Sequence, residues 1–187
     1  MPSPLGHALG GIAAGWLVSS GASTVGTAPG PPPSGTASRV PWLTTAALAG
    51  LGIAPDLDFL VGLHSRQSHS LGAALLAGLV AAVLARGARA RWAMAATAAW
   101  ASHALLDWLG DDSTPPIGVM ALWPFSDAFY QSDVRWFLAI WRRSDAAGFW
   151  THNLTAIAWE LALLGPVVAA LWLWKRERTL IPSSWRS

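Results

Sequence analysis

The feature that most constrains this chain is a series of long apolar runs in which ionisable residues are scarce. The runs lie at about 5–20, 43–63, 71–85, 92–109 and 154–174. A helix needs roughly 20 apolar residues to cross the hydrocarbon core of a bilayer. The last run meets that length, the second and fourth meet it with ionisable groups inside, the third is short and the first is the weakest. The sequence therefore predicts an all-α fold, a multi-helix integral membrane bundle of about four to five helices.

Composition supports this prediction and narrows the function. Apolar residues make up 53% of the chain and charged residues only 12%, about half the charged share of a typical soluble domain. Thirteen Trp residues exclude a disordered chain. The twelve cations are scattered and the net charge is only +2, so no nucleic-acid partner is expected. Because the chain has no Cys, a metal site must use His, Asp and Glu.

The 187 residues are predicted to form a single domain, residues 1–187, with a flexible linker rich in Pro, Gly and Ser at 21–41. No Lys or Arg precedes Arg39, so a cleavable signal peptide is not expected. Lys and Arg near membrane segments prefer the cytoplasmic side. Placing Arg39, the RGARAR turn and the basic tail there puts eight of the twelve cations inside. Residues 56–70 and 103–152, which hold most of the acidic and histidine residues, then fall at the outer face.

Two blocks of the sequence suggest metal ligands. His103 and Asp107 are four residues apart on a predicted helix, so both side chains emerge on one face and can bind the same divalent ion. A lone pair at this spacing is also common as a helix surface contact. Asp56 and Asp58 follow Pro55, which breaks the helix and exposes Asp56 as a ligand. Asp58 either joins it or orients a neighbouring histidine, and both carboxylates could instead mark a helix end at the membrane surface.

The other candidates are ranked by their surroundings. His64 and His69 flank a short turn and are candidate ligands, and Arg66 between them is a candidate phosphate-binding cation, although a lone Arg there could simply reach the interface. His7 is an isolated histidine that the predicted orientation brings to the same face. Three further residues complete the set: His152 and Glu160, eight apart on the last helix and held as second rank, and Asp127, a possible general base.

The combined blocks resemble a known family. Gly6-His7, PDLD at 55–58, LHSRQSHS at 63–70, SHALLD at 102–107 and LWPFSD at 122–127 are similar, in order and spacing, to bacterial membrane-bound metal-dependent hydrolases of the YdjM type, also described as LexA-binding inner-membrane proteins. The likeness covers residues 4–130, and 154–174 resembles that family's last helix. It implies a hydrolase of the bacterial inner membrane, with seven residues on the polar motif positions: His7, Asp56, Asp58, His64, His69, His103 and Asp107.

This chain departs from the family pattern at one point. The family commonly reads HRGxTHS, whereas here His64 is followed by Ser65 before Arg66, and Ser68 stands in place of Thr. The role of His64 is therefore left open. A more distant similarity, to zinc-dependent phospholipase C, is an analogy only.

From these residues we expect one to three divalent ions, with Zn²⁺ favoured by His and carboxylate ligands, to activate water for hydrolysis. Asp58 or Asp127 would act as the general base. The expected substrate is a phosphoester or lipid-like molecule, and the expected partner is membrane lipid, with the oligomeric state left open. One alternative is a membrane protein that handles or transports metal through the same side chains. The other is a non-catalytic interaction protein.

Overall fold

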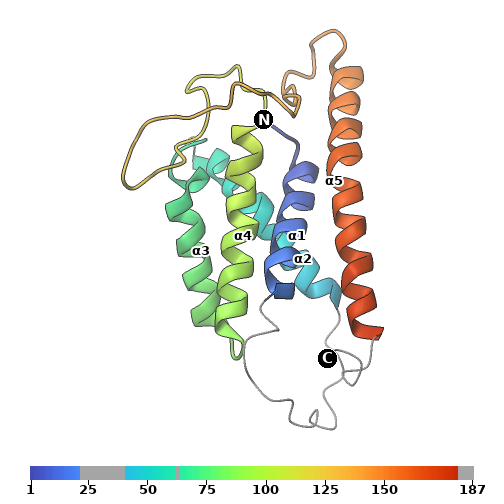
Figure 1. The fold of residues 1–187 in the computed structure, drawn as a ribbon. Coiled ribbons are helices and arrows are strands. Elements are labelled where there is room, and N and C mark those ends of the chain that lie inside the picture. The colour runs from blue at the N-terminus through green and yellow to red at the C-terminus, as the bar shows by residue number, and fades with distance from the viewer. Residues whose placement is uncertain (22–40, 62–63, 181–187) are drawn as a thin grey trace, which may run out of the picture.

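The computed structural model describes residues 1–21, 41–61 and 64–180, which form five α-helices and two short 3-10 helices (Figure 1). In chain order these are α1 (Pro4–Gly21), α2 (Pro41–Ile53), η2 (Ala54–Val61), η3 (Gln67–His69), α3 (Leu71–Leu84), α4 (Arg89–Trp108) and α5 (Phe149–Leu180). In the described part of the chain, β pairing is limited to two isolated bridges in the loop between α4 and α5. The all-α prediction is confirmed. Residues 22–40 of the predicted linker lie outside the described residues.

The helices lie side by side, with α4 packed against α1, α2 and α3, and α1 packed also against α2 and α5. The long loop between α4 and α5 covers one end of the molecule, next to the first residues of the chain (Figure 1). The turn from α3 to α4 and the end of α5 lie at the opposite end. This arrangement brings the start of α1, the end of α2 and the end of α4 to the end that the loop covers.

The second apolar run, at 43–63, is not one continuous α-helix. Helix α2 ends at Ile53 and the chain continues as η2. Pro55 accounts for this change because it lacks an N–H and disfavours the α conformation in the residue before it. The break predicted at Pro55 is therefore present, and it carries Asp56 and Asp58 on a 3-10 segment in place of a regular α-helix.

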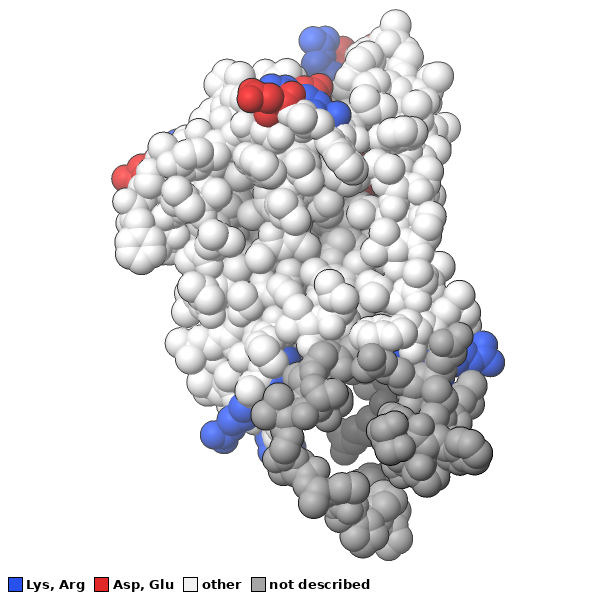
Figure 2. Space-filling view, in the orientation of Figure 1, with Lys and Arg blue, Asp and Glu red and all other residues white. Residues whose placement is uncertain are grey.

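Two described segments are long and apolar enough to cross a membrane: Trp42–Leu60 and Phe149–Arg176. Helix α3 is apolar but shorter, and it exposes a row of large side chains that includes Leu75, Leu79 and Val83. Figure 2 shows charged side chains gathered at the two ends of the visible face, with an almost uncharged band between them. These features fit insertion into a membrane.

Candidate metal centre

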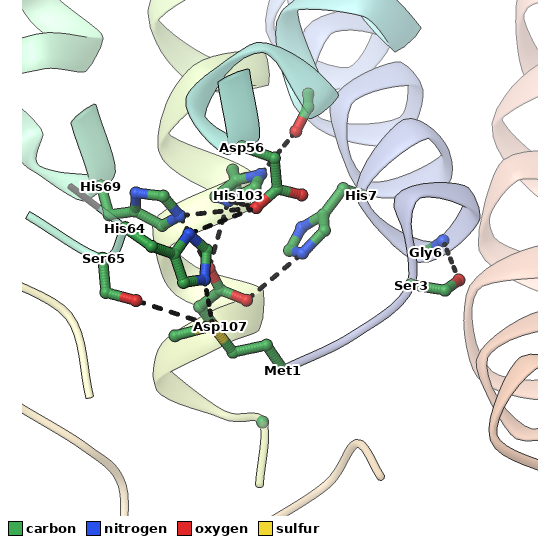
Figure 3. A network of polar contacts seen from close by, with 12 residues as sticks. Met1, Ser3, Gly6, His7, Asp56, His64, Ser65, His69, His103 and Asp107 are labelled. Carbon is green, nitrogen blue, oxygen red and sulfur yellow. Dashed lines mark hydrogen bonds and ion pairs between the residues drawn. The ribbon is translucent and has the colours of Figure 1, made fainter. Parts of the chain in front are cut away.

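A buried carboxylate, Asp107, lies at the centre of a polar cluster (Figure 3). It projects from α4 one turn after His103, whose Nε2 is 3.1 Å from Oδ2 of Asp107. His7 of α1 approaches the other oxygen, with its Nε2 3.2 Å from Oδ1. The two imidazole rings stack at a centroid distance of 3.7 Å. All three side chains are buried, and their ligand atoms are close enough together to hold one metal ion.

The end of α2 fixes the orientation of His103. Nδ1 of His103 lies 2.7 Å from the carbonyl oxygen of Gly52, which is in the last turn of α2. Since a carbonyl oxygen only accepts hydrogen bonds, Nδ1 carries the proton and Nε2 keeps its lone pair, which faces Asp107. Fixing one ring nitrogen through a backbone carbonyl is how proteins commonly orient histidine ligands.

A second set of donors comes from η2 and the segment that leads into α3. Oδ1 of Asp56 lies 3.7 Å from Nε2 of His69 and 3.9 Å from Nδ1 of His64, and these three residues form a second group that could hold a metal ion. Asp56 is also 3.6 Å from Nε2 of His103. Nε2 of His69 is 3.3 Å from Oδ2 of Asp107. The two groups are thus adjacent, and Figure 3 shows their side chains converging from α1, η2, η3 and α4. We call these six residues the metal cluster: His7, Asp56, His64, His69, His103 and Asp107.

Asp58 lies behind the metal cluster. Its carboxylate is 3.0 Å from Nδ1 of His64 and 3.2 Å from Nδ1 of His69, and it accepts a hydrogen bond of 2.6 Å from the Ser68 hydroxyl. These contacts occupy both oxygens. The geometry therefore fits the orienting role, in which Asp58 holds the Nδ1 side of each ring and leaves Nε2 of His69 facing the metal cluster.

The interior of the metal cluster contains polar atoms without hydrogen bonds. They are Nδ1 of His7, Nε2 of His69, Nε2 of His103 and both carboxylate oxygens of Asp107. Nε2 of His69 and Nε2 of His103 lie within ion-pair distance of Oδ2 of Asp107 but not in hydrogen-bond geometry. Leaving buried polar groups unpaired costs about 1–3 kcal/mol each, and more for charged groups. A divalent cation would satisfy the nitrogen lone pairs and the carboxylate together, so the residues present fit a metal ion.

The electrostatics of His69 agree with this. Burial lowers the pKa of His69, but the side chains of Asp56 and Asp58, together with the charge of Asp107, outweigh burial and raise the pKa to about 9. Without a metal, the carboxylates therefore draw a proton onto this imidazole. A divalent cation would supply positive charge at the same place and release that proton.

A cavity of about 770 Å³ opens beside the metal cluster, under the loop between α4 and α5. Asp56 and His64 form part of its wall. The other walls combine apolar groups, such as Phe59 and Trp141, with the guanidinium group of Arg142. The metal cluster is thus buried on the helix side and reachable from one end of the molecule.

A family model for the YdjM inner membrane protein matches residues 1–181. The chain belongs to this family. No curated protein and no solved structure matches the chain. Family membership confirms the resemblance seen in the sequence motifs and agrees with the two apolar segments in assigning the protein to a membrane.

The structure brings together all seven residues that the family resemblance singled out. Six form the metal cluster and Asp58 supports it. Two features of the sequence predicted part of this cluster: the one-turn spacing of His103 and Asp107, and the helix break at Pro55. His64 belongs to the metal cluster despite the extra residue after it, and this residue, Ser65, adopts a positive φ of 65°.

The two second-rank residues lie outside the metal cluster. Glu160 of α5 is buried and accepts hydrogen bonds from the backbone N–H of Ser3, at 2.6 Å, and from the Ser3 hydroxyl. It therefore ties the start of α1 to α5. The Nε2–H of His152 donates to the Ala139 carbonyl oxygen at 2.8 Å, and its ring stacks on Trp141. His152 thus supports the loop that forms the cavity wall.

Two predicted site residues are not brought to the metal cluster. Asp127 is exposed in the loop and lines no part of the cavity. Arg66 is also exposed and lies outside the cavity wall. The cation that does reach the site is Arg142, whose Nη2 is 3.5 Å from Nε2 of His64. Arg142 belongs to the segment 103–152 that the distribution of cations places at the outer face, but no sequence motif points to a role for it.

Proposed function

We propose that the protein is a metal-dependent hydrolase that cleaves a phosphoester in a lipid-like substrate. The observation that carries the proposal is the set of buried, unpaired nitrogen and oxygen atoms in the metal cluster, which adjoin a cavity large enough for a substrate head group. Ionisable groups inside a membrane protein are costly and generally serve a function. Hydrolysis at a divalent metal is a chemistry that this donor set suits.

The chain's own residues divide the work between holding the ion and admitting the substrate. His7, His69, His103, Asp56 and Asp107 would hold the metal, for which Zn²⁺ is our choice because the donors are imidazoles and carboxylates. When bound, the ion would supply an activated water and polarise the phosphoryl oxygen. Asp58 accepts the Nδ1 proton of His64, so Nε2 of His64 is on the cavity side of the ring, where it lies 2.9 Å from Sδ of Met1. His64 can therefore either join the ligands or face the substrate.

The cavity supports a substrate with both a charged and an apolar part. Arg142 brings positive charge to its wall, while Leu138, Ile140 and Trp141 supply apolar surface. A phosphorylated head group with an attached hydrocarbon portion matches this combination. In a membrane, phospholipids and phosphorylated lipid carriers are the obvious candidates.

We further propose that the protein crosses the bacterial inner membrane several times with the metal cluster toward the periplasm. Arg86 lies in the turn between α3 and α4, Arg89 and Arg91 lie in the first turn of α4, and Lys175 lies near the end of α5. These segments are at the end of the molecule opposite the loop between α4 and α5 (Figure 1). Lys and Arg near membrane segments prefer the cytoplasm. The cavity would then open on the opposite side.

The decisive experiment is metal analysis of the purified protein followed by a hydrolysis screen. We expect a stoichiometric divalent ion in the wild type and its loss in His103→Ala and Asp107→Ala. His152→Ala is the matched control, because His152 lies in the cavity wall but outside the metal cluster, and it should retain the ion. The metal-loaded protein is then assayed against phospholipids, phosphorylated lipid carriers and soluble phosphodiesters. Absence of metal from the wild type would contradict the proposal, and metal binding without hydrolysis would favour metal handling.

A further inference from the structure

Arg142 lies against an aromatic ring beside the metal cluster. Its guanidinium lies over the ring of Phe59, with Cζ 4.1 Å from the ring centroid. That ring in turn stacks on His64 at 3.6 Å. The three side chains form a column that ends at the metal cluster, and all three line the cavity. Stacking on an aromatic face fixes the plane of a guanidinium while leaving its N–H groups free to donate.

Arg142 has no carboxylate partner in the described part of the chain, unlike Arg143 and Arg135. Arg143 pairs with Asp145 at 3.0 Å, and Arg135 pairs with Asp111 at 3.1 Å. Three carboxylates also line the cavity. Asp56 belongs to the metal cluster, Asp111 is already paired with Arg135, and Asp112 accepts backbone hydrogen bonds from Thr114 and Gly118 within its own loop. Of the two arginines in the cavity wall, Arg142 is therefore the one whose charge remains available to a molecule that enters the cavity.

We propose that Arg142 is the anion-binding residue of the cavity, and that it binds the phosphoryl group of a phosphate monoester or diester beside the metal cluster. A guanidinium presents forked N–H donors that match phosphate oxygens, and such charge-assisted hydrogen bonds are the strong ones. The Nη2 atom is 3.5 Å from Nε2 of His64, so an anion held by Arg142 lies next to a residue of the metal cluster. The identity of this anion as a substrate rests on the proposed function, but anion binding itself does not.

The test uses the full-length, metal-loaded protein in detergent micelles and measures binding of radiolabelled inorganic phosphate by equilibrium dialysis. Arg142→Gln should weaken phosphate binding about tenfold or more, because it removes the charge and the forked donors. Arg142→Lys should recover only part of the affinity, since an ammonium keeps the charge without the fork. Arg143→Gln and Arg66→Gln are the matched controls, and both should bind within about threefold of the wild type. Metal content is measured in each variant to show that the metal cluster is intact.

Competition identifies the source of the phosphoryl group. Displacement of inorganic phosphate by phosphatidic acid in the micelles, and not by glycerol 3-phosphate, would indicate a lipid head group. Displacement by glycerol 3-phosphate would indicate a soluble ester, and displacement by neither compound would overturn the proposal.

The proposal would also be overturned if the wild-type protein bound no phosphate, or if the Arg142→Gln variant bound phosphate as well as the wild type does. Arg142-dependent binding without hydrolysis would refute the proposed function alone, whereas hydrolysis with an unchanged KM in Arg142→Gln would refute this inference alone.

Discussion

Nδ1 of His103 donates a hydrogen bond to the carbonyl oxygen of Gly52, 2.7 Å away, and this bond turns Nε2 toward Asp107. The donor is on α4 and the acceptor is in the last turn of α2. A backbone carbonyl near the break at Pro55 therefore sets the tautomer of a buried histidine in the metal cluster. The metal centre depends on how closely α1, α2 and α4 approach one another at this point.

Gly52 permits that approach, and replacing it should disturb both the packing and the metal centre. A Cβ at this position would lie 2.3 Å from the backbone oxygen of His7. We expect Gly52→Ala to destabilise the fold by about 1–3 kcal/mol, the usual range for overpacking, and to weaken metal binding because His7 and the Gly52 carbonyl both shift. Thermal unfolding and metal titration in detergent measure the two effects.

Gly50 provides the matched control on the same helix. A Cβ there would meet nothing within 4 Å, so Gly50→Ala should leave metal affinity unchanged and keep or slightly raise the melting temperature, since Ala favours a helix more than Gly does. If Gly52→Ala behaved in the same way as Gly50→Ala, the close contact between α1 and α2 would not govern the site.

Local sequence rules predicted much of this arrangement. Apolar runs gave the five helices, Pro55 gave the break, and the one-turn spacing of His103 and Asp107 gave the ligand pair. Each of these signals depends on residues close together in the chain. The structure differs in the lengths of α2 and α5, because helix ends depend on packing and capping as well as on hydropathy.

The loop between α4 and α5 could not be predicted in the same way. It has no hydrophobic periodicity, and its path is set by contacts between distant residues, such as the backbone bonds from Trp136 to Leu109 and from Met120 to Ser65. Arg66 was chosen as the phosphate-binding cation because it is near the histidines in sequence. The loop instead folds back and brings Arg142 to the cavity, 78 residues from His64.

The contact between Glu160 and Ser3 should matter for the metal centre although neither residue belongs to the metal cluster. Ser3 accepts from the backbone N–H of Gly6 through its hydroxyl and from that of His7 through its carbonyl, so Glu160 anchors the turn that carries His7. We expect Glu160→Gln to lower the stability by about 1–3 kcal/mol, because the amide nitrogen of Gln cannot accept a hydrogen bond and leaves a buried donor of Ser3 unpaired, and to weaken metal binding. Thermal unfolding with and without metal gives both quantities.

Thr155→Val is the control for Glu160→Gln. Thr155 lies on the same helix, is exposed, and bonds only locally to the Thr151 carbonyl oxygen. The Thr155→Val substitution should change the free energy of unfolding by no more than about 0.5 kcal/mol, as is usual for surface substitutions. A metal affinity in Glu160→Gln equal to that of this control would show that α1 is held in place by other contacts.

The stability of the metal-free protein should fall as pH rises through the range in which His69 loses its proton. Its pKa is raised from 6.5 to about 9 in the fold. The protonated imidazole therefore stabilises the fold fully when the pH is below 6.5, the pKa of His69 in the unfolded chain. This contribution is lost as the pH rises toward about 9, the pKa in the fold. Thermal melts of chelator-treated protein from pH 6.5 to 9 measure the trend, which should be absent in His69→Gln. The stabilisation given by added metal should increase over the same range, because the ion replaces the proton. A melting temperature that rises with pH in the metal-free wild type would contradict this account.

The proposed orientation predicts which end of the molecule is accessible from the periplasm. The chain has no Cys, so single cysteines can be placed at Ala88, in the turn before α4, and at Ser113, in the cavity wall. A membrane-impermeant maleimide added to intact spheroplasts should label the Ser113→Cys protein and leave the Ala88→Cys protein unlabelled, because the surrounding arginines hold the turn in the cytoplasm. Both should react once the membrane is permeabilised, which shows that neither thiol is buried. Labelling of Ala88→Cys alone in intact spheroplasts would place the cavity and the metal cluster on the cytoplasmic side, and the substrate would then have to be sought in that leaflet.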